Sequence, residues 1–554
     1  MIRICLKQNK QNYIVFLSGL LFILLISSVC HLLFSKLGFN PTDDGFILAY
    51  SRRILQGEIP HKDFISIRPV LSPIIHLPIL IVGKQNVLIF SRFFVWLELS
   101  FISWCWIIII ERFLKLKLTV LYKIILALIT FFISVNSFQI MAWHTIDGLV
   151  LITTGLLLYT SSKNNWKNLS IFIISCSYLC KQSFIFVPLA ILLISDDWKK
   201  IKYWITIALP IIIYFTFSLF TNSFKDTFIQ LTSKKGILTI ISFFNLERKL
   251  WTGIALGFIL MTIPIFEIIK SSSKYDKIKF ISYFLLSFIP LIYSCTTFLN
   301  YNYPNMVDHA FLLFGFVLGI VLFSFLANDE KNAELKNIGV VLIIVAFCVS
   351  LSMGASNPAL FSGTLIGFLI IFSLSLIVNN NVKIIFKTLV ILFLILLSIS
   401  FFNIRTNYIY REQRGEYLTE RLDNVLSGAN GIFTNVNTYS FLADLKKAVQ
   451  ISLDSNKTYS IIPDIAAYWI TSKERNPLPI DWTLDVELSD DILKNTVKNK
   501  LNYLRPDNYV IIDKIDTWEL QNGFTPIGNN YYIVNYVKSN FTKINETKYF
   551  EIYK

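Results

Sequence analysis

The chain has 554 residues, of which 54% are hydrophobic and 16% are charged. Together with a mean hydropathy of +0.58, this composition excludes an ordinary soluble protein, a disordered chain and a fibrous repeat. The net charge of +15 comes mostly from lysines and arginines in short connections between apolar runs, so we expect no nucleic-acid partner. Because the apolar runs reach the length of about 20 residues that crosses a bilayer as a helix, the sequence predicts an integral, multi-spanning membrane protein.

Thirteen membrane spans are predicted in chain order. The first follows a basic start, is longer than the apolar part of a signal peptide and lacks a small-residue cleavage site, so we expect it to be retained. The long connection 36–86 after it is interrupted by five prolines. The predicted spans are residues 13–35, 87–110, 119–138, 144–162, 167–180, 183–195, 201–221, 250–270, 278–299, 307–326, 337–354, 360–378 and 384–403.

Basic residues in the connections predict the orientation. Every second connection carries lysine or arginine, for example Arg112–Lys117, Lys199–Lys202 and Lys383–Lys387. Connections of this kind stay on the cytoplasmic side. We therefore expect a protein of the cytoplasmic membrane with its N-terminus inside, and thirteen spans then place residues 404–554 outside.

Residues 404–554 differ in character from the rest of the chain. They are polar and contain no cysteine, since all seven cysteines precede residue 403. A helical pattern over Tyr439–Leu453 is followed by short apolar segments of strand type, Tyr459–Ile462 and Tyr509–Asp513. The predicted fold is an α-helical membrane domain of about 13 transmembrane helices, residues 1–403, followed by a small extracytoplasmic α/β domain, residues 404–554.

The connection 36–86 carries the first polar candidates. Asp43 and Asp44 follow the first span directly. Adjacent carboxyl groups tend to separate in pKa, so one of them could act as a general base, although Thr42 or Asp43 could equally well cap a helix from about Gly45 to Gln56. Arg68 could bind an anionic head group such as phosphate, or could extend to the membrane boundary.

Three further polar groups fall on the same predicted outer side. His144 and Asp147 share a helical face, which suits a hydrogen-bonded pair, two metal ligands or simple helix caps. Lys181 and Gln182 interrupt an apolar run. The segment Asn300–His309 ends in Asp308 and His309, and an ordinary loop without a functional role is the plainer interpretation of it. Because transporters usually place such groups near the midplane of the membrane, this pattern favours an outward-facing active site.

These residues resemble the GT-C superfamily of polytopic glycosyltransferases, in the branch of the protein O-mannosyltransferases and the bacterial lipid A aminoarabinose transferase. The resemblance covers the first half of the membrane domain, and the stretch 462–477 is similar to outer domains attached to such enzymes. The motifs are Asp43-Asp44-Gly45, Ala49-Tyr-Ser-Arg-Arg-Ile-Leu-Gln-Gly-Glu-Ile-Pro, Asp63-Phe, Arg68-Pro69, Asp147 and Lys181-Gln182.

The resemblance implies transfer of one sugar from a polyprenyl-phosphate carrier to an acceptor of the cell envelope: lipopolysaccharide, another glycan, a lipid or a protein. It implies that Asp43 is the catalytic base, with Asp44 where the family usually has Glu, and that Asp147 lines the same cavity. Arg68 stands where some relatives use a lysine to contact the carrier phosphate, and Lys181 could add charge stabilisation there. A single displacement would invert the anomeric centre.

No obligatory cofactor is predicted, but a divalent metal ion is possible if Asp43, Asp44, His144 and Asp147 meet. Two other functions stay open. The chain could be an oligosaccharide polymerase or ligase that uses a lipid-linked chain, or a transporter or flippase without bond chemistry.

Overall fold

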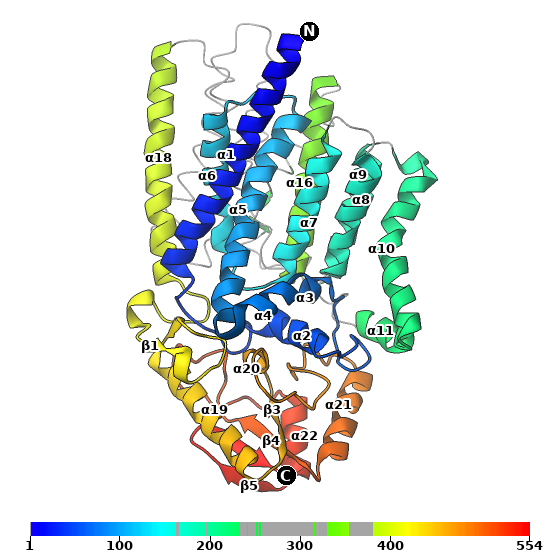
Figure 1. Cartoon of the computed structure of the whole chain (residues 1–554), viewed down its shortest axis with the longest axis vertical. Coiled ribbons are helices and arrows are strands. Elements are labelled where there is room, and N and C mark those ends of the chain that lie inside the picture. Colours follow the sequence, from blue (N-terminus) through cyan, green and yellow to red (C-terminus); the bar gives the residue numbers. More distant parts are fainter. Residues whose placement is uncertain are drawn as a thin grey trace.

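The computed structural model describes residues 2–161, 166–195, 197–232, 330–353 and 380–554, with a few isolated positions between 241 and 318. These residues form a bundle of helices with an α/β domain at one end, and the N-terminus lies at the other end (Figure 1). The predicted spans 250–270, 278–299, 307–326 and 360–378 lie almost entirely outside the described residues. Asp308 and His309 also lie outside them.

Each of the other predicted spans contains a helix of the bundle. Among the described residues, four helical segments are long and apolar enough to cross a membrane: Asn12–Phe34, Leu71–Phe113, Ile201–Phe220 and Lys387–Asn407. Four apolar helices are shorter, so the count of thirteen spans stays a prediction. The bundle helices are α1 (Ile2–Phe34), α5 (Val87–Phe113), α6 (Val120–Ser134), α7 (His144–Tyr159), α8 (Lys167–Cys176), α9 (Phe186–Ile194), α10 (Ile201–Phe220), α16 (Glu330–Ser352) and α18 (Asn380–Asn407).

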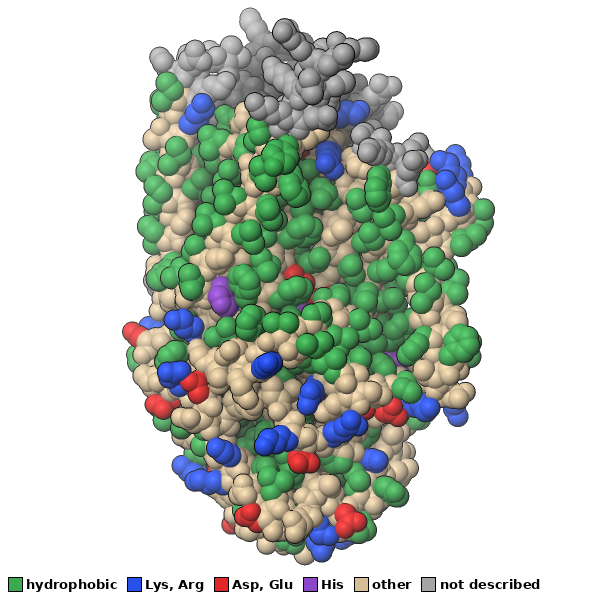
Figure 2. Space-filling view, in the orientation of Figure 1, with side chains coloured by type: hydrophobic (Ala, Val, Ile, Leu, Met, Phe, Trp, Pro, Cys, Tyr) green, Lys and Arg blue, Asp and Glu red, His purple; other side chains and the backbone are tan. Residues whose placement is uncertain are grey.

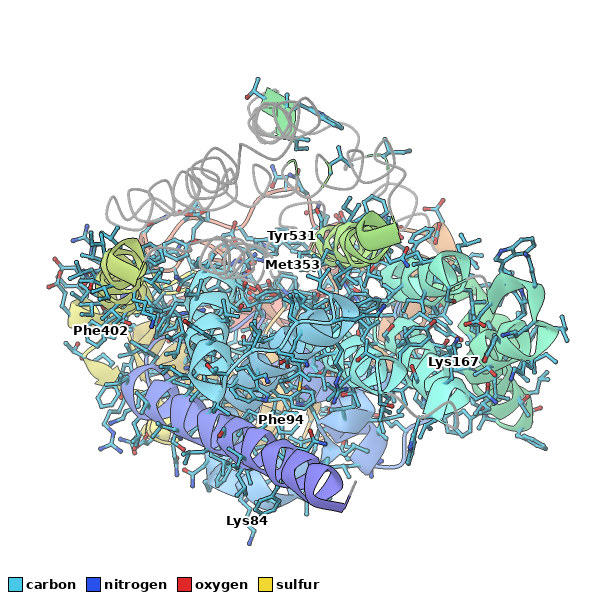
Figure 3. The ribbon with its side chains drawn as sticks, turned by 90° about the horizontal axis from the view of Figure 1, so that it is seen from above. Lys84, Phe94, Lys167, Met353, Phe402 and Tyr531 are labelled. Carbon is cyan, nitrogen blue, oxygen red and sulfur yellow. The ribbon has the colours of Figure 1, made fainter. Side chains whose placement is uncertain are left out.

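The outer faces of the bundle are apolar. Leu21 of α1, Phe220 of α10 and Ile384 of α18 are 66%, 84% and 63% exposed, which a bilayer accommodates and water does not. Figure 2 shows hydrophobic side chains over the bundle and charged ones gathered over the α/β domain. Figure 3, seen along the bundle, places Phe402 of α18 at one side and Lys167 of α8 toward the other.

The basic connections share one end of the bundle. The α5–α6 and α9–α10 connections, which contain Arg112–Lys117 and Lys199–Lys202, lie at the end that carries the N-terminus (Figure 1). The α/β domain covers the opposite end. This arrangement agrees with the alternation of charge, while the assignment of the basic end to the cytoplasm stays a prediction from the positive-inside rule.

The connection 36–86 lies between the bundle and the α/β domain (Figure 1). It contains α2 (Phe46–Leu55), α3 (Leu71–Ile75), α4 (Leu77–Gly83) and the short helix η1 (Lys84–Asn86). Helix α2 occupies the segment where the sequence predicts a helix. The capping interpretation is wrong, however, because Gly45 is the N-cap and its helix has no side-chain cap in the described structure. Thr42 and Asp43 make other contacts.

The α/β domain is built on a four-stranded sheet in the order β3-β4-β6-β5. β3 (Thr458–Ile462) runs parallel to β4 (Asn508–Asp513), whereas β6 (Phe550–Tyr553) is antiparallel to β4 and to β5 (Lys543–Glu546). Parallel strands bring their carboxyl ends to one edge, where Asp464 and Asp513 lie. The domain also contains the helices α19 (Val436–Asp454), α20 (Ala466–Trp469), α21 (Asp491–Leu504) and α22 (Tyr532–Asn540), and a two-stranded sheet of β1 (Glu420–Arg421) and β2 (Phe433–Thr434).

Candidate active site

Asp43 lies at the boundary between the bundle and the α/β domain, in the turn before α2. Its side chain is 4% exposed. Its Oδ2 accepts a hydrogen bond of 2.7 Å from the Tyr410 hydroxyl and lies 2.8 Å from Nη1 of Arg411. Burial raises the pKa of the Asp43 carboxyl above its usual value, while Arg411 and Tyr410 act in the opposite direction. An upward shift brings a carboxylate closer to the pKa that suits a general base.

Asp44 has a different set of partners from Asp43. Its Oδ1 lies 3.0 Å from Nη2 of Arg92, and its Oδ2 accepts a hydrogen bond of 2.8 Å from the backbone N–H of Asn40. Arg92 also donates to the carbonyl oxygens of Ser35 and Gly38, at 2.9 and 2.7 Å. Asp44 therefore holds the turn that carries Asp43, so the two carboxylates have separate environments.

A cavity of about 70 Å³ lies beside Asp44, where α1 and α18 end. Its polar wall contains Asp44, Arg92, Arg405 and Tyr410, and Tyr410 is the residue that donates to Asp43. Its other walls are largely apolar, with Phe34, Leu37, Phe39, Phe138, Ile140, Met141, Ile404 and Ile409 among the lining residues. The cavity thus combines guanidinium groups with an apolar lining at the edge of the membrane-type bundle.

Arg68 contacts the α/β domain. Its Nη1 and Nη2 donate to the two carboxylate oxygens of Glu487 at 2.8 and 2.7 Å, and its guanidinium carbon lies 5.0 Å from the centre of the Phe46 ring. Arg68 is close enough to Asp43 to affect the titration of that carboxyl. Binding of a phosphate by Arg68 stays a prediction, and it requires Glu487 to share or release the guanidinium.

The structure brings the Lys181 motif to the connection 36–86. Nζ of Lys181 lies 3.1 Å from Nε2 of His144, and Gln182 donates to the carbonyl oxygen of Ile67 at 2.8 Å. The ring of His144 stacks on Trp143. Those of the predicted motifs that the structure describes therefore lie at one end of the bundle.

Asp147 has partners that the sequence analysis did not predict. Its carboxylate accepts a hydrogen bond from Ser72 and lies 3.0 Å from Nε2 of His76, both in the connection 36–86. The four residues considered for one metal ion, namely Asp43, Asp44, His144 and Asp147, do not form a group of close ligand atoms in the described part of the chain. Asp147 instead belongs to another cluster, with His76 and Glu98.

Sequence reasoning missed Arg92, Arg405, Tyr410 and Arg411. Arg92 lies inside a predicted span, and an ionisable residue within a span is itself a signal of a functional or structural site. Tyr410 and Arg411 carried no such signal, because they follow the last span by a few residues and reach Asp43 only through the packing of α18 against α1 and α6.

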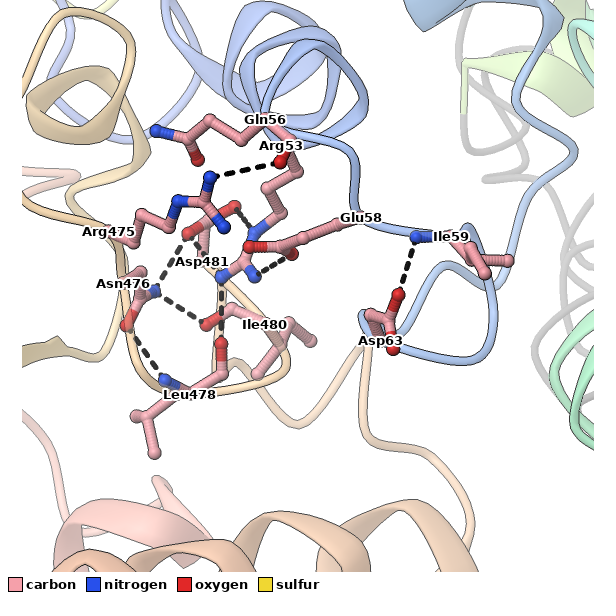
Figure 4. Close-up of polar contacts among 10 residues, drawn as sticks. All are labelled: Arg53, Gln56, Glu58, Ile59, Asp63, Arg475, Asn476, Leu478, Ile480 and Asp481. Carbon is pink, nitrogen blue, oxygen red and sulfur yellow. Dashed lines mark hydrogen bonds and ion pairs between the residues drawn. The ribbon is translucent and has the colours of Figure 1, made fainter.

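The α/β domain covers this site through buried polar contacts with α2 and the turn before it. Arg53 of α2 binds Asp481 through Nε at 2.6 Å and Nη2 at 2.8 Å, the Leu478 carbonyl oxygen at 2.8 Å, and Glu58 at 2.8 Å (Figure 4). Closer to the site, the Thr42 hydroxyl donates to Asp464 at 3.1 Å. The domain is thus anchored directly to the segment that carries Asp43.

The close approach of Gly45 to Ala467 leads to a first prediction. A Cβ atom at Gly45 would lie 2.2 Å from the Ala467 Cα, a backbone atom that cannot move aside alone. We expect Gly45→Ala to push the α/β domain away from α2 and to lower stability by at least the roughly 1–3 kcal/mol of an overpacked site. Thermal unfolding in detergent measures this loss. Gly528→Ala is the control, because nothing lies within 4 Å of its Cβ position, and equal melting temperatures for the two variants would contradict the prediction.

Asp464 leads to a prediction about pH. Its carboxylate accepts hydrogen bonds from Thr42, Thr517 and Trp518, yet burial raises its pKa from 3.8 to about 6. The folded protein therefore holds this proton more tightly than the unfolded chain. The resulting contribution to stability is fully present below about pH 4, decreases as the pH rises to about 6, and is absent above that value.

The comparison of wild type with Asp464→Asn tests this contribution. Between pH 5 and pH 8 we expect the stability of wild type relative to the variant to decrease by about 1.4 kcal/mol, the equivalent of one pKa unit. Burial lowers the pKa of His61 to about 4, so the stability contribution of His61 changes with pH in the opposite sense. This contribution is the same in both proteins and cancels in the comparison. Melting curves at the two pH values provide the measurement, and a difference that does not change with pH would refute the assignment.

No protein-family model matches the sequence, and no curated protein matches it either. A solved structure that the chain resembles is that of ArnT from Cupriavidus metallidurans bound to undecaprenyl phosphate. The two chains are 10% identical, the likeness covers 98% of each, and the TM-score is 0.43.

Proposed function

We propose that this protein is a membrane glycosyltransferase that moves a single sugar from a polyprenyl-phosphate donor to an acceptor of the cell envelope. Asp43 is the general base and the reaction inverts the anomeric centre. The acceptor is lipopolysaccharide, another glycan, a lipid or a protein on the outer face of the cytoplasmic membrane.

The observation that carries this proposal is the environment of Asp43. Asp43 is a buried carboxyl group with a raised pKa, and a cavity close to it has Arg92 and Arg405 in its wall together with many apolar residues. A polyprenyl phosphate needs this combination, because its phosphate requires cationic partners and its chain requires an apolar surface at the membrane. Tyr410 connects Asp43 with that cavity, because it lines the cavity and donates a hydrogen bond to Asp43.

The proposed chemistry uses few groups. Asp43 accepts the proton of an acceptor hydroxyl as its oxygen attacks the anomeric carbon, and the bond from that carbon to the phosphate oxygen breaks. The leaving group is a phosphate, so it needs charge stabilisation rather than a proton. Arg68 and Lys181 are the proposed sources of positive charge for the leaving phosphate, together with Arg92 and Arg405 in the cavity wall.

The size of the transferred unit tests this proposal against its closest alternative. We expect mass spectrometry of the envelope glycoconjugates from a deletion strain to show the loss of one sugar residue, restored by the wild-type gene. Loss of a whole repeating chain would point to a polymerase or ligase. Movement of the donor across vesicles that contain the purified wild-type protein, with no cleavage of the donor, would point to a flippase.

A further inference from the structure

Three ionisable side chains from different elements, none of them a contact of Asp43, meet inside the bundle. His76 lies between α3 and α4, Glu98 lies within α5, and Asp147 lies in the first turn of α7. One potential ligand atom of each lies within 4.8 Å of the others. His76 and Asp147 are 0% exposed and Glu98 is 7% exposed. The connection 36–86 is therefore joined here to two bundle helices by buried polar groups.

Among the described residues, no lysine or arginine balances the charges of this cluster. Within the described residues, neither Glu98 nor Asp147 forms an ion pair with lysine or arginine, and the ion-pair partner of Asp147 is His76. Oε2 of Glu98 is buried and has no hydrogen-bond partner there. Two carboxylates so close together in an apolar interior need a compensating positive charge or bound protons.

We propose that His76, Glu98 and Asp147 bind one divalent metal ion, for which Zn²⁺ fits best. One imidazole nitrogen and two carboxylate oxygens are common ligands of Zn²⁺, and the two carboxylates neutralise its charge. Ligand atoms of a tetrahedral zinc site lie about 3.3 Å apart, and Nε2 of His76 lies 3.0 Å from Oδ1 of Asp147. The Ser72 hydroxyl hydrogen-bonds the other carboxylate oxygen of Asp147 and so orients that ligand, and a water molecule would complete the four ligands.

The ion has a positioning role in this proposal. It links the α3–α4 corner to α5 and α7 and so fixes the connection that also carries Asp43 and Arg68. The proposal does not depend on the proposed glycosyltransferase activity, because its test measures bound metal and thermal stability.

Metal analysis of the purified protein tests the site. The protein is prepared in detergent without a histidine tag, equilibrated with ZnCl₂ or MnCl₂, desalted and analysed by plasma mass spectrometry. We expect about one zinc ion per wild-type chain, and at least a fivefold lower content in Glu98→Gln and in His76→Gln. Glu111→Gln is the matched control, because Glu111 lies on the same helix and pairs with Lys123 at 2.9 Å, and it should retain the wild-type content.

A stability measurement guards against variants that fail to fold. A zinc chelator should lower the melting temperature of wild type and of Glu111→Gln but leave that of Glu98→Gln unchanged. If the wild-type protein binds neither zinc nor manganese, the proposal is overturned. Bound protons would then neutralise the carboxylates of the cluster. Wild-type metal content in Glu98→Gln would overturn the assignment of the ligands.

Discussion

Asp43→Asn should reduce sugar transfer by about 10²–10⁴-fold, the usual contribution of a general base. Asparagine has nearly the shape of aspartate, so the contact with Tyr410 can persist, but the amide cannot accept the proton of the acceptor hydroxyl. The rate to measure is the release of free polyprenyl phosphate from the lipid-linked donor at saturating acceptor. Because the substitution leaves the donor cavity in place, we expect the loss in kcat rather than in KM for the donor.

The control for this variant is Asp226→Asn, which makes the same chemical change at an exposed carboxylate of α11 (Phe224–Leu231). It should transfer sugar at the wild-type rate. An Asp43→Asn protein that is folded and retains more than a tenth of the wild-type rate would show that another group takes the proton. Asp44 would then be the next candidate, even though Arg92 and the Asn40 backbone hold it in this structure.

Arg53→Met should loosen the α/β domain from the bundle. The Arg53 guanidinium is buried against Asp481, Glu58 and the Leu478 carbonyl group, so its loss leaves the Asp481 carboxylate buried and without its cationic partner. Removing one member of a buried pair typically costs about 3–5 kcal/mol. We expect a lower melting temperature, faster proteolysis between α18 and the domain, and reduced sugar transfer, because α2 follows the turn that holds Asp43.

The neighbouring Arg52→Met is the matched control. Arg52 is on the same turn of α2, and no salt bridge to it is found within the described residues. Adding Asp481→Asn to Arg53→Met removes the unpaired charge and should recover part of the lost stability. Equal melting temperatures for Arg52→Met and Arg53→Met would mean that the Arg53 pair does not hold the domain.

The local elements of the fold are readable in the sequence. Apolar runs of sufficient length predict the positions of α1, α5, α10 and α18, because in a bilayer every backbone group must be paired within its own helix. Helix α2 and helix α19 follow from helical spacing of apolar residues. The parallel pairing of β3 with β4 joins residues about 50 positions apart, and no local pattern specifies it.

The candidate site is only partly predictable, for the same reason. Asp43, Arg68 and Lys181 stand out because charged residues at the membrane boundary are costly and need partners. Their partners come from distant segments: Arg411 pairs with Asp43, and Glu487 pairs with Arg68. A single sequence identifies the costly charge but does not identify the group that compensates it.

The most direct test of the proposed function is donor cleavage by the purified wild-type protein. The protein in lipid nanodiscs is incubated with a panel of polyprenyl-phosphate sugars and a whole envelope extract as acceptor, and the free polyprenyl phosphate released above the background of the extract is quantified by mass spectrometry. We expect release from one donor of the panel, dependent on the acceptor and abolished in Asp43→Asn. A folded protein that releases polyprenyl phosphate from none of the donors would contradict a transferase that uses such carriers.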